Sequence, residues 1–145
     1  IVTTRAVLVR EREETEVFFL ETKDGLQLPG GIIEFERAIP DWDLGNFIAS
    51  CQQYLREQVR IETPWLSYIG DYPEDDGLCR VYGYSFNDNG FPVGYRGIWL
   101  ALSQVPVERL CSKWEMEAVR CWLDPKFIRG KGLSQAACRV DQFAY

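Results

Sequence analysis

The stretch from Leu26 to Ile61 constrains this chain more than any other part of it. It opens with Pro29-Gly30-Gly31, where two residues without a Cβ atom let the backbone take unusual dihedral angles and approach another group closely. A metal ion or a phosphate is the kind of group that such a turn can approach. We therefore expect a tight turn here, with a binding role for Gly30 and Gly31.

An amphipathic helix is predicted to follow this turn, from about Gly45 onwards. Its apolar residues recur at i, i+3, i+7 and i+11, which places Ile48, Cys51, Leu55 and Val59 on one stripe. The polar residues that lie away from this stripe are Gln53, Arg56, Glu57 and Arg60. We expect this polar face to look back towards the Gly-Gly turn, as in a loop and helix that hold a metal-bound phosphate chain.

These residues resemble the signature of the Nudix family. That signature is a Gly, five residues, a Glu and seven residues, followed by Arg-Glu-aliphatic-any-Glu-Glu-any-Gly-aliphatic. The run from Leu28 to Glu34, LPGGIIE, is similar to its opening, and the run from Leu55 to Gly70 is similar to the way the family leaves it. The resemblance covers nearly the whole chain. It implies an α/β fold for a single domain over 1–145, a Nudix-like α/β/α sandwich with a mixed β-sheet, a box helix and a C-terminal helix.

The middle of the signature departs from the family. Arg37 stands where the first Glu is expected, and an insert around Ala38 to Gly45 separates it from the helix. Two registers are open for the helix itself. With Leu55 at the aliphatic position, Tyr54 replaces the catalytic Glu and Glu57-Gln58 replace the Glu-Glu pair. The register one residue earlier puts Gln53 at the catalytic position and Arg56-Glu57 at the pair. Either register leaves one helix carboxylate, Glu57.

The resemblance implies Mg²⁺ or Mn²⁺ as the cofactor of an active protein. Hydrolysis of a diphosphate needs such hard cations to neutralise the phosphate charge and activate a water. The family pattern makes Glu57 the candidate catalytic residue and, with Glu34, a candidate metal ligand. Arg56 and Arg60 disfavour a cation beside them and suit a phosphate, so they are candidate substrate-binding residues together with Gly30 and Gly31.

A second group of candidate metal ligands lies late in the chain. The segment from Trp114 to Leu123 resembles the place where many Nudix proteins put a late Glu ahead of a Trp-containing strand. Glu115 or Glu117 therefore becomes a further candidate metal ligand. Alternation with Met116 and Ala118 predicts a strand over this segment, and we expect that strand to end at Asp124-Pro125.

The remaining pattern is rich in strands. A charged turn separates two apolar, β-branched runs that predict an antiparallel pair, over Ile1 to Val9 and Val17 to Leu20. Turn-rich breaks delimit three further predicted strands, over Trp65 to Tyr72, Leu78 to Phe86 and Tyr95 to Leu102. Helical spacing from Leu133 to Ala144 predicts a terminal helix that packs on the sheet.

Composition removes several classes of function. The net charge of −6 argues against broad electrostatic binding to nucleic acid or an anionic membrane. Because the chain has no His, zinc sites of the usual Cys/His kind, Ser-His-Asp triads and Cys-His dyads are excluded. No apolar run approaches the length of a membrane span, so no membrane partner is expected. The five cysteines include no C-x-x-C pair, which predicts reduced thiols in an intracellular protein.

Two functions from different classes follow. In the first, a Nudix-like domain has lost catalytic carboxylates and acts as a binding or assembly module for a nucleotide, an RNA 5′ end, a protein partner or a second copy of itself. In the second, it is a Mg²⁺-dependent hydrolase of nucleoside diphosphate derivatives or RNA 5′ phosphates. Its ligands would then be recruited from Glu34, Glu36, Asp41, Asp43, Glu57, and Glu115 or Glu117. The loss of helix carboxylates favours the first function.

Overall fold

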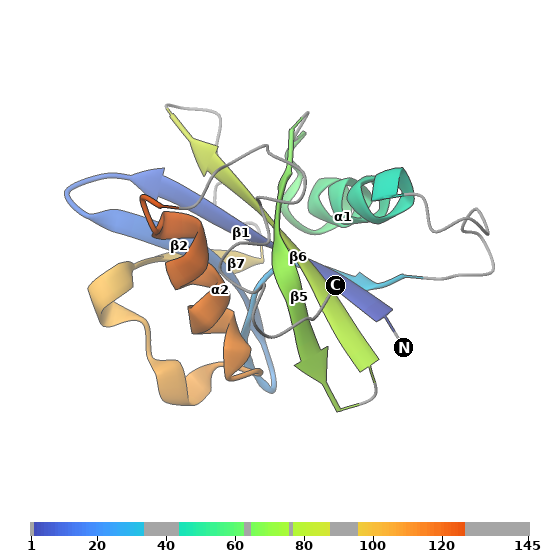
Figure 1. Ribbon diagram of the computed structural model, residues 1–145. Coiled ribbons are helices and arrows are strands. Elements are labelled where there is room, and N and C mark those ends of the chain that lie inside the picture. Colours follow the sequence, from blue (N-terminus) through green and yellow to red (C-terminus); the bar gives the residue numbers. More distant parts are fainter. Residues whose placement is uncertain (1, 34–43, 63–64, 76, 88–95, 127–145) are drawn as a thin grey trace.

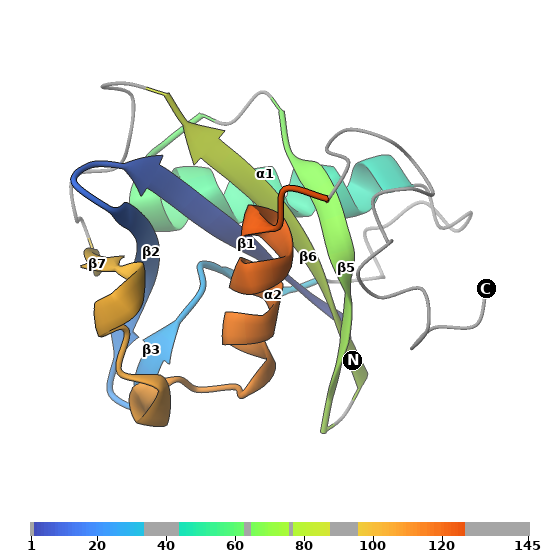
Figure 2. The ribbon, with the colours of Figure 1, turned by 60° about the vertical axis from the view of Figure 1, so that its left-hand side comes forward.

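A mixed β-sheet lies between two helices in the part of the chain that the computed structural model describes, residues 2–33, 44–62, 65–75, 77–87 and 96–126 (Figure 1). The sheet has seven strands in this part: β1 (Val2–Glu11), β2 (Thr15–Thr22), β3 (Gly25–Gln27), β4 (Gly30–Ile32), β5 (Ser67–Glu74), β6 (Gly77–Phe86) and β7 (Gly97–Ala101). The helices are α1 (Leu44–Val59) and α2 (Trp114–Leu123), one on each face of the sheet (Figure 2). The predicted α/β/α sandwich with a mixed sheet and a box helix is confirmed.

β1 is the central strand, and its side chains alternate between the hydrophobic cores on the two faces of the sheet. Ala6 and Leu8 belong to the core beneath α1, whereas Val7 and Val9 belong to the core beneath α2. All four side chains are buried, as expected for a strand covered on both faces.

The pairing of the strands makes the sheet mixed. β1 pairs antiparallel with β2 and β4, but parallel with β6 over a long register from Val2 opposite Leu78 to Arg10 opposite Phe86. β5 and β6 form an antiparallel hairpin, and β7 pairs antiparallel with β2. The predicted β1–β2 pair and the predicted strands around residues 65–72, 78–86 and 95–102 are therefore confirmed.

The apolar stripe predicted for the box helix faces the sheet. Cys51, Leu55 and Val59 are buried against β1 and β6, while Ile48 lies at the half-buried edge of the stripe. Burial raises the pKa of the Cys51 thiol to about 12, so it behaves as an apolar core residue.

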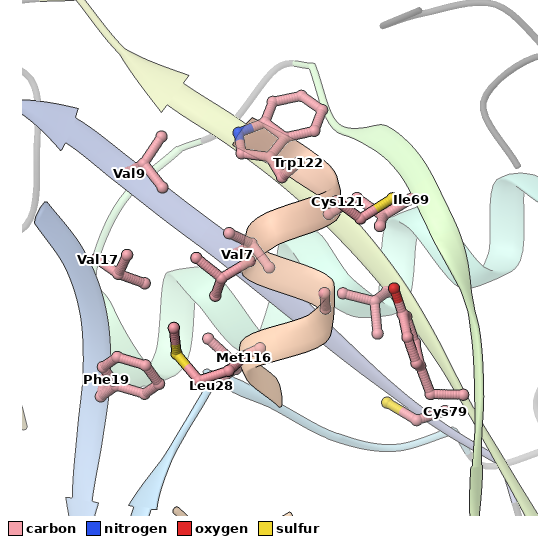
Figure 3. Packing of buried hydrophobic residues seen from close by; sticks show 14 of the residues in the cluster. Val7, Val9, Val17, Phe19, Leu28, Ile69, Cys79, Met116, Cys121 and Trp122 are labelled. Atoms are coloured by element: carbon pink, nitrogen blue, oxygen red, sulfur yellow. The ribbon is translucent and has the colours of Figure 1, made fainter. Parts of the chain in front are cut away.

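The segment from Trp114 to Leu123 is an α-helix, so the prediction of a strand is wrong. Met116, Val119 and Trp122 recur at i, i+3 and i+6 and pack on the α2 side of the sheet together with Cys121 (Figure 3). The prediction of a strand rested on the alternation of Met116 and Ala118 and left out the apolar residues that follow at helical spacing. The terminal helix predicted from Leu133 to Ala144 lies outside the described residues.

The described cysteines are either free thiols or disulfide-bonded. Cys51, Cys79 and Cys111 are free thiols, whereas Cys121 is disulfide-bonded, so the prediction of reduced cysteines is wrong for Cys121. Neither helix in the described ranges combines the length and apolarity that crossing a membrane requires.

Candidate functional site

Gly30 and Gly31 lie in strand β4, after a bend at Pro29, so the prediction of a tight turn at the two glycines is wrong. The segment Pro29 to Gly31, for which we keep the name Gly-Gly turn, is fastened to helix α1 through the side chain of Gln58. The Gly30 N–H donates to Gln58 Oε1 at 2.9 Å, and Gln58 Nε2 donates to the Gly30 carbonyl at 2.8 Å. Gly30 has a φ of +148°, and a Cβ atom built on it would lie 2.0 Å from the Thr4 carbonyl oxygen. Only glycine fits this close approach, which places its peptide within reach of the Gln58 amide.

Tyr54 covers the second glycine of the turn. Its hydroxyl donates to the Ile32 carbonyl at 2.7 Å. A Cβ atom built on Gly31 would lie 2.4 Å from Cζ of the Tyr54 ring. The ring therefore rests on the glycine backbone, and it fills the space in which a larger residue or a ligand would contact Gly31.

The start of the turn is held from the opposite layer. Arg5 donates from Nη1 to the Leu28 carbonyl at 2.9 Å, and the Leu28 N–H donates to Glu115 Oε1 at 2.6 Å. The Pro29 carbonyl accepts from the Ala6 N–H at 2.9 Å. With the bonds of Gln58 and Tyr54, the carbonyls of residues 28, 29, 30 and 32 each accept a hydrogen bond from this chain.

Glu115 is enclosed at the start of α2. It is fully buried, and its second oxygen, Oε2, accepts from the Ser112 N–H at 2.9 Å. Burial raises the pKa of the Glu115 carboxyl above its usual value, while the bonds from Leu28 and Ser112 and the charge of Arg5 act in the opposite direction. Glu117, two residues further on, lies on the exposed side of α2. The two predicted late ligands thus point to different sides of the helix.

The polar residues predicted on the box helix lie at the surface. Glu57 is exposed and accepts a hydrogen bond from Gln53 Nε2 at 3.4 Å. Arg56 is 3.7 Å from the Glu62 carboxylate, and both side chains are well exposed. Arg60 follows the helix with a φ of +57°. Glu34 lies outside the described residues, and within the described ranges no three His, Cys, Asp or Glu side chains gather closely enough to hold a metal ion.

A pocket of about 710 Å³ opens beside this network. One wall is the end of the β5–β6 hairpin, the other is the segment that leads into α2, and β1 and β4 also contribute lining residues. Its charged lining residues are Arg5, Glu74, Asp75 and Lys113. Ile32 and Trp114 supply apolar surface, and Trp114 is stacked on Tyr72 with ring centroids 5.1 Å apart.

The sequence patterns assign no role to Tyr54, Gln58 or Arg5, three of the residues that organise this site. Tyr54 and Gln58 were recognised only as departures from the Nudix signature, and Arg5 was not singled out. For Glu115 a signal was present. Ser112-x-x-Glu115 before an apolar run is the pattern of a capping box, in which the Glu side chain reaches back to a backbone N–H at the start of a helix.

No model of a known protein family matches this sequence, and no curated protein matches it significantly. Solved structures do share its fold. The match to the Nudix domain of Shewanella oneidensis NrtR, solved with ADP ribose, has 14% identity and a TM-score of 0.60, and covers 84% of this chain and 85% of that one. The match to the Ap4A hydrolase of C. elegans has 11% identity and a TM-score of 0.60, and covers 84% of this chain and 95% of that one.

A third similar structure differs in the share of the chain that it covers. The C-terminal domain of mouse MUTYH, solved in complex with human PCNA, is 12% identical with a TM-score of 0.61, and the match covers 99% of this chain and 98% of that one. Identities this low carry information on the fold alone, since one fold hosts many functions.

Proposed function

We propose that this chain, which has the Nudix fold, is a binding module that does not hydrolyse diphosphates. The observation that carries this proposal is the pair of contacts that Tyr54 and Gln58 make with the Gly-Gly turn. Two neutral side chains from the box helix bind the backbone of the turn directly.

Three features support the register of the Nudix signature that puts Leu55 at its first aliphatic position. Leu55 is fully buried. Arg60, at the signature's Gly position, has the positive φ that favours glycine, and Ile61, at the final aliphatic position, is buried. In this register Tyr54 takes the place of the catalytic Glu, and Gln58 takes the place of the second Glu of the pair.

These replacements do not fit a Mg²⁺ site. Mg²⁺ is bound in proteins through carboxylates, together with water and substrate phosphates, in near-octahedral geometry. The Gln58 amide and the Tyr54 phenol carry no negative charge, and both already bond to the turn. Glu57 is the one carboxylate left at the signature positions of the helix, and it lies exposed beside Gln53.

The late carboxylates have other roles in this proposal. Glu115 joins the turn to the start of α2 by accepting from Leu28 and Ser112, which is a structural role. Glu117 is a surface residue of α2. Gly30 and Gly31 serve close packing against Thr4 and Tyr54 instead of contacting a substrate. Arg56 and Arg60 are exposed cations at the end of α1, and Arg56 is paired with Glu62.

The similar structures are compatible with either a hydrolase or a binding module. Two of them are named for a Nudix domain bound to ADP ribose and for an Ap4A hydrolase, whereas the match that spans nearly the whole chain is to a domain solved with a protein partner. A protein partner is therefore part of the proposal.

The test is a titration of the wild type with Mg²⁺ and Mn²⁺ by calorimetry, beside a turnover screen with ADP ribose and Ap4A. We expect neither metal binding nor turnover. The variant Tyr54→Glu with Gln58→Glu restores three carboxylates to the helix, and we expect it to gain Mg²⁺ binding. Ala49→Glu with Gln104→Glu is the matched control, because it adds the same charge at two exposed positions without placing three carboxylates on one face of α1. Metal-dependent turnover by the wild type would refute the proposal and establish a remodelled hydrolase.

A further inference from the structure

The pocket between the β5–β6 hairpin and α2 has walls of opposite charge. Glu74 and Asp75 lie on the hairpin turn, and Lys113 lies on the segment that leads into α2. Asp75 and Lys113 are exposed, so both charges are accessible to a partner. Glu74 is half-buried and accepts a hydrogen bond from Thr3 Oγ1 at 2.8 Å, which fixes the acidic wall against β1.

Apolar surface lies between these charged walls. Ile32 is 55% exposed, which makes it one of four large exposed hydrophobic residues in the described part of the chain. Pro73 is exposed and Trp114 is half-buried, and both line the same pocket. An exposed aliphatic side chain beside an aromatic ring is typical of a place where a partner buries an apolar side chain.

The charges of the pocket do not favour a polyphosphate. Among its described lining residues two cations stand against two carboxylates, and Arg5 already bonds to the Leu28 carbonyl and lies near the buried Glu115 carboxyl. A diphosphate requires an excess of positive charge or a bound metal ion to offset its own charge. A peptide that carries both signs of charge meets no such requirement, because each wall can pair with one of its side chains.

We infer that this pocket binds a segment of a protein partner in which an apolar side chain is flanked by an acidic residue on one side and a basic residue on the other. The apolar side chain packs on Ile32, Pro73 and Trp114. The acidic residue pairs with Lys113, and the basic residue pairs with Asp75. This inference rests on the proposed function, because it requires a module that recognises a partner without turning over a nucleotide.

The experiment is a selection of random displayed peptides on the wild-type chain, followed by affinity measurements with the enriched peptides as synthetic, fluorescent probes. We expect enrichment of an apolar residue between opposite charges. Lys113→Glu and Asp75→Lys should each weaken binding about tenfold, because each puts like charges together. The double variant should prefer a peptide in which the two charges are exchanged.

A matched control reverses two charges outside the pocket. Glu108 and Arg109 are exposed and belong to a 3₁₀ helix, Val107–Arg109, that precedes α2. Glu108→Lys with Arg109→Glu should leave peptide affinity within about twofold of the wild type. The same set of variants is titrated with ADP and ADP ribose as nucleotide probes.

Three results would overturn the inference. The selection could enrich no peptide, or the affinity of the enriched peptides could be unchanged by the charge reversals. The third is a nucleotide that binds the wild type and no longer binds Lys113→Glu. The proposed function fails separately, through metal-dependent turnover. A failed peptide selection in a chain without turnover therefore rejects the peptide site alone.

Discussion

Gly31→Ala tests whether the Tyr54 ring occupies the space beside the Gly-Gly turn. The added Cβ would lie 2.4 Å from Cζ and 2.6 Å from Cε1 of that ring. Real carbon atoms do not approach so closely, so the ring or the strand must move. The ring is tied down by the 2.7 Å hydrogen bond from its hydroxyl to Ile32, and moving it breaks that bond.

The expected magnitude depends on whether the ring is present. In the wild type we expect Gly31→Ala to lower the free energy of unfolding by about 1–3 kcal/mol, the usual cost of overpacking. Gly31 does not have a positive φ, so alanine fits its backbone. In a Tyr54→Ala background the same change should therefore be neutral, or raise the free energy of unfolding by about 0.4–1 kcal/mol, because alanine lowers the conformational entropy of the unfolded chain. The two substitutions should therefore couple by about 1–4 kcal/mol, which is the difference between these two effects.

Urea unfolding of the four proteins, followed by circular dichroism, measures this coupling. Tyr54→Phe is the control background, because it keeps the ring and removes only the hydroxyl, so the part of the cost that comes from the clash with the ring should persist and the part that comes from breaking the bond to Ile32 should be lost. An equal cost of Gly31→Ala in the wild type and in Tyr54→Ala would show that the ring does not fill this space. It would then remove one of the contacts that support the proposed loss of hydrolysis.

Three further predictions concern the same network. Gln58→Ala should lower the free energy of unfolding by about 1–3 kcal/mol, because both polar groups of the Gly30 peptide lose their partner, and an unchanged urea midpoint would contradict this. Arg60→Gly should raise the free energy of unfolding by up to about 1 kcal/mol, since glycine takes a φ of +57° without a Cβ clash, whereas a lower thermal midpoint would oppose the argument. For Glu115, burial raises the native pKa above the unfolded value, so the native state holds the extra proton between the two values and loses stability as the pH rises through them. The wild type should therefore become less stable relative to Glu115→Gln from acid towards neutral pH, and a stability difference that does not change with pH would refute this.

Local patterns predicted the fold well where one periodicity dominated. The helical stripe of Cys51, Leu55 and Val59 and the β-branched residues of β1 each have a single reading, and the structure confirms both. Met116 and Ala118 alone fit a strand, whereas the helical spacing of Met116, Val119 and Trp122 and the capping pattern from Ser112 to Glu115 favour the helix that forms.

The candidate site could be predicted only in part, because its contacts join distant segments. The helix α1 follows from the sequence, whereas Gly30 and Gly31 lie in strand β4 instead of the predicted tight turn. The bond of Gln58 to Gly30 and the packing of Tyr54 on Gly31 depend on how the helix docks on the sheet, which periodicity does not specify. Likewise, the burial of Glu115 depends on Leu28 being next to the start of α2, and these residues are far apart in the chain.

The parallel pairing of β1 with β6 also determines the order in which the chain can fold. β1 is the centre of the sheet, yet its long parallel partner begins at Gly77, well past α1. Contacts between segments so far apart close a large loop before they stabilise anything, which slows folding. During synthesis β1, β2 and α1 emerge first, and one edge of β1 stays without β6 until β6 leaves the ribosome. A truncation that ends before β6 should therefore yield an aggregation-prone fragment instead of a smaller folded domain.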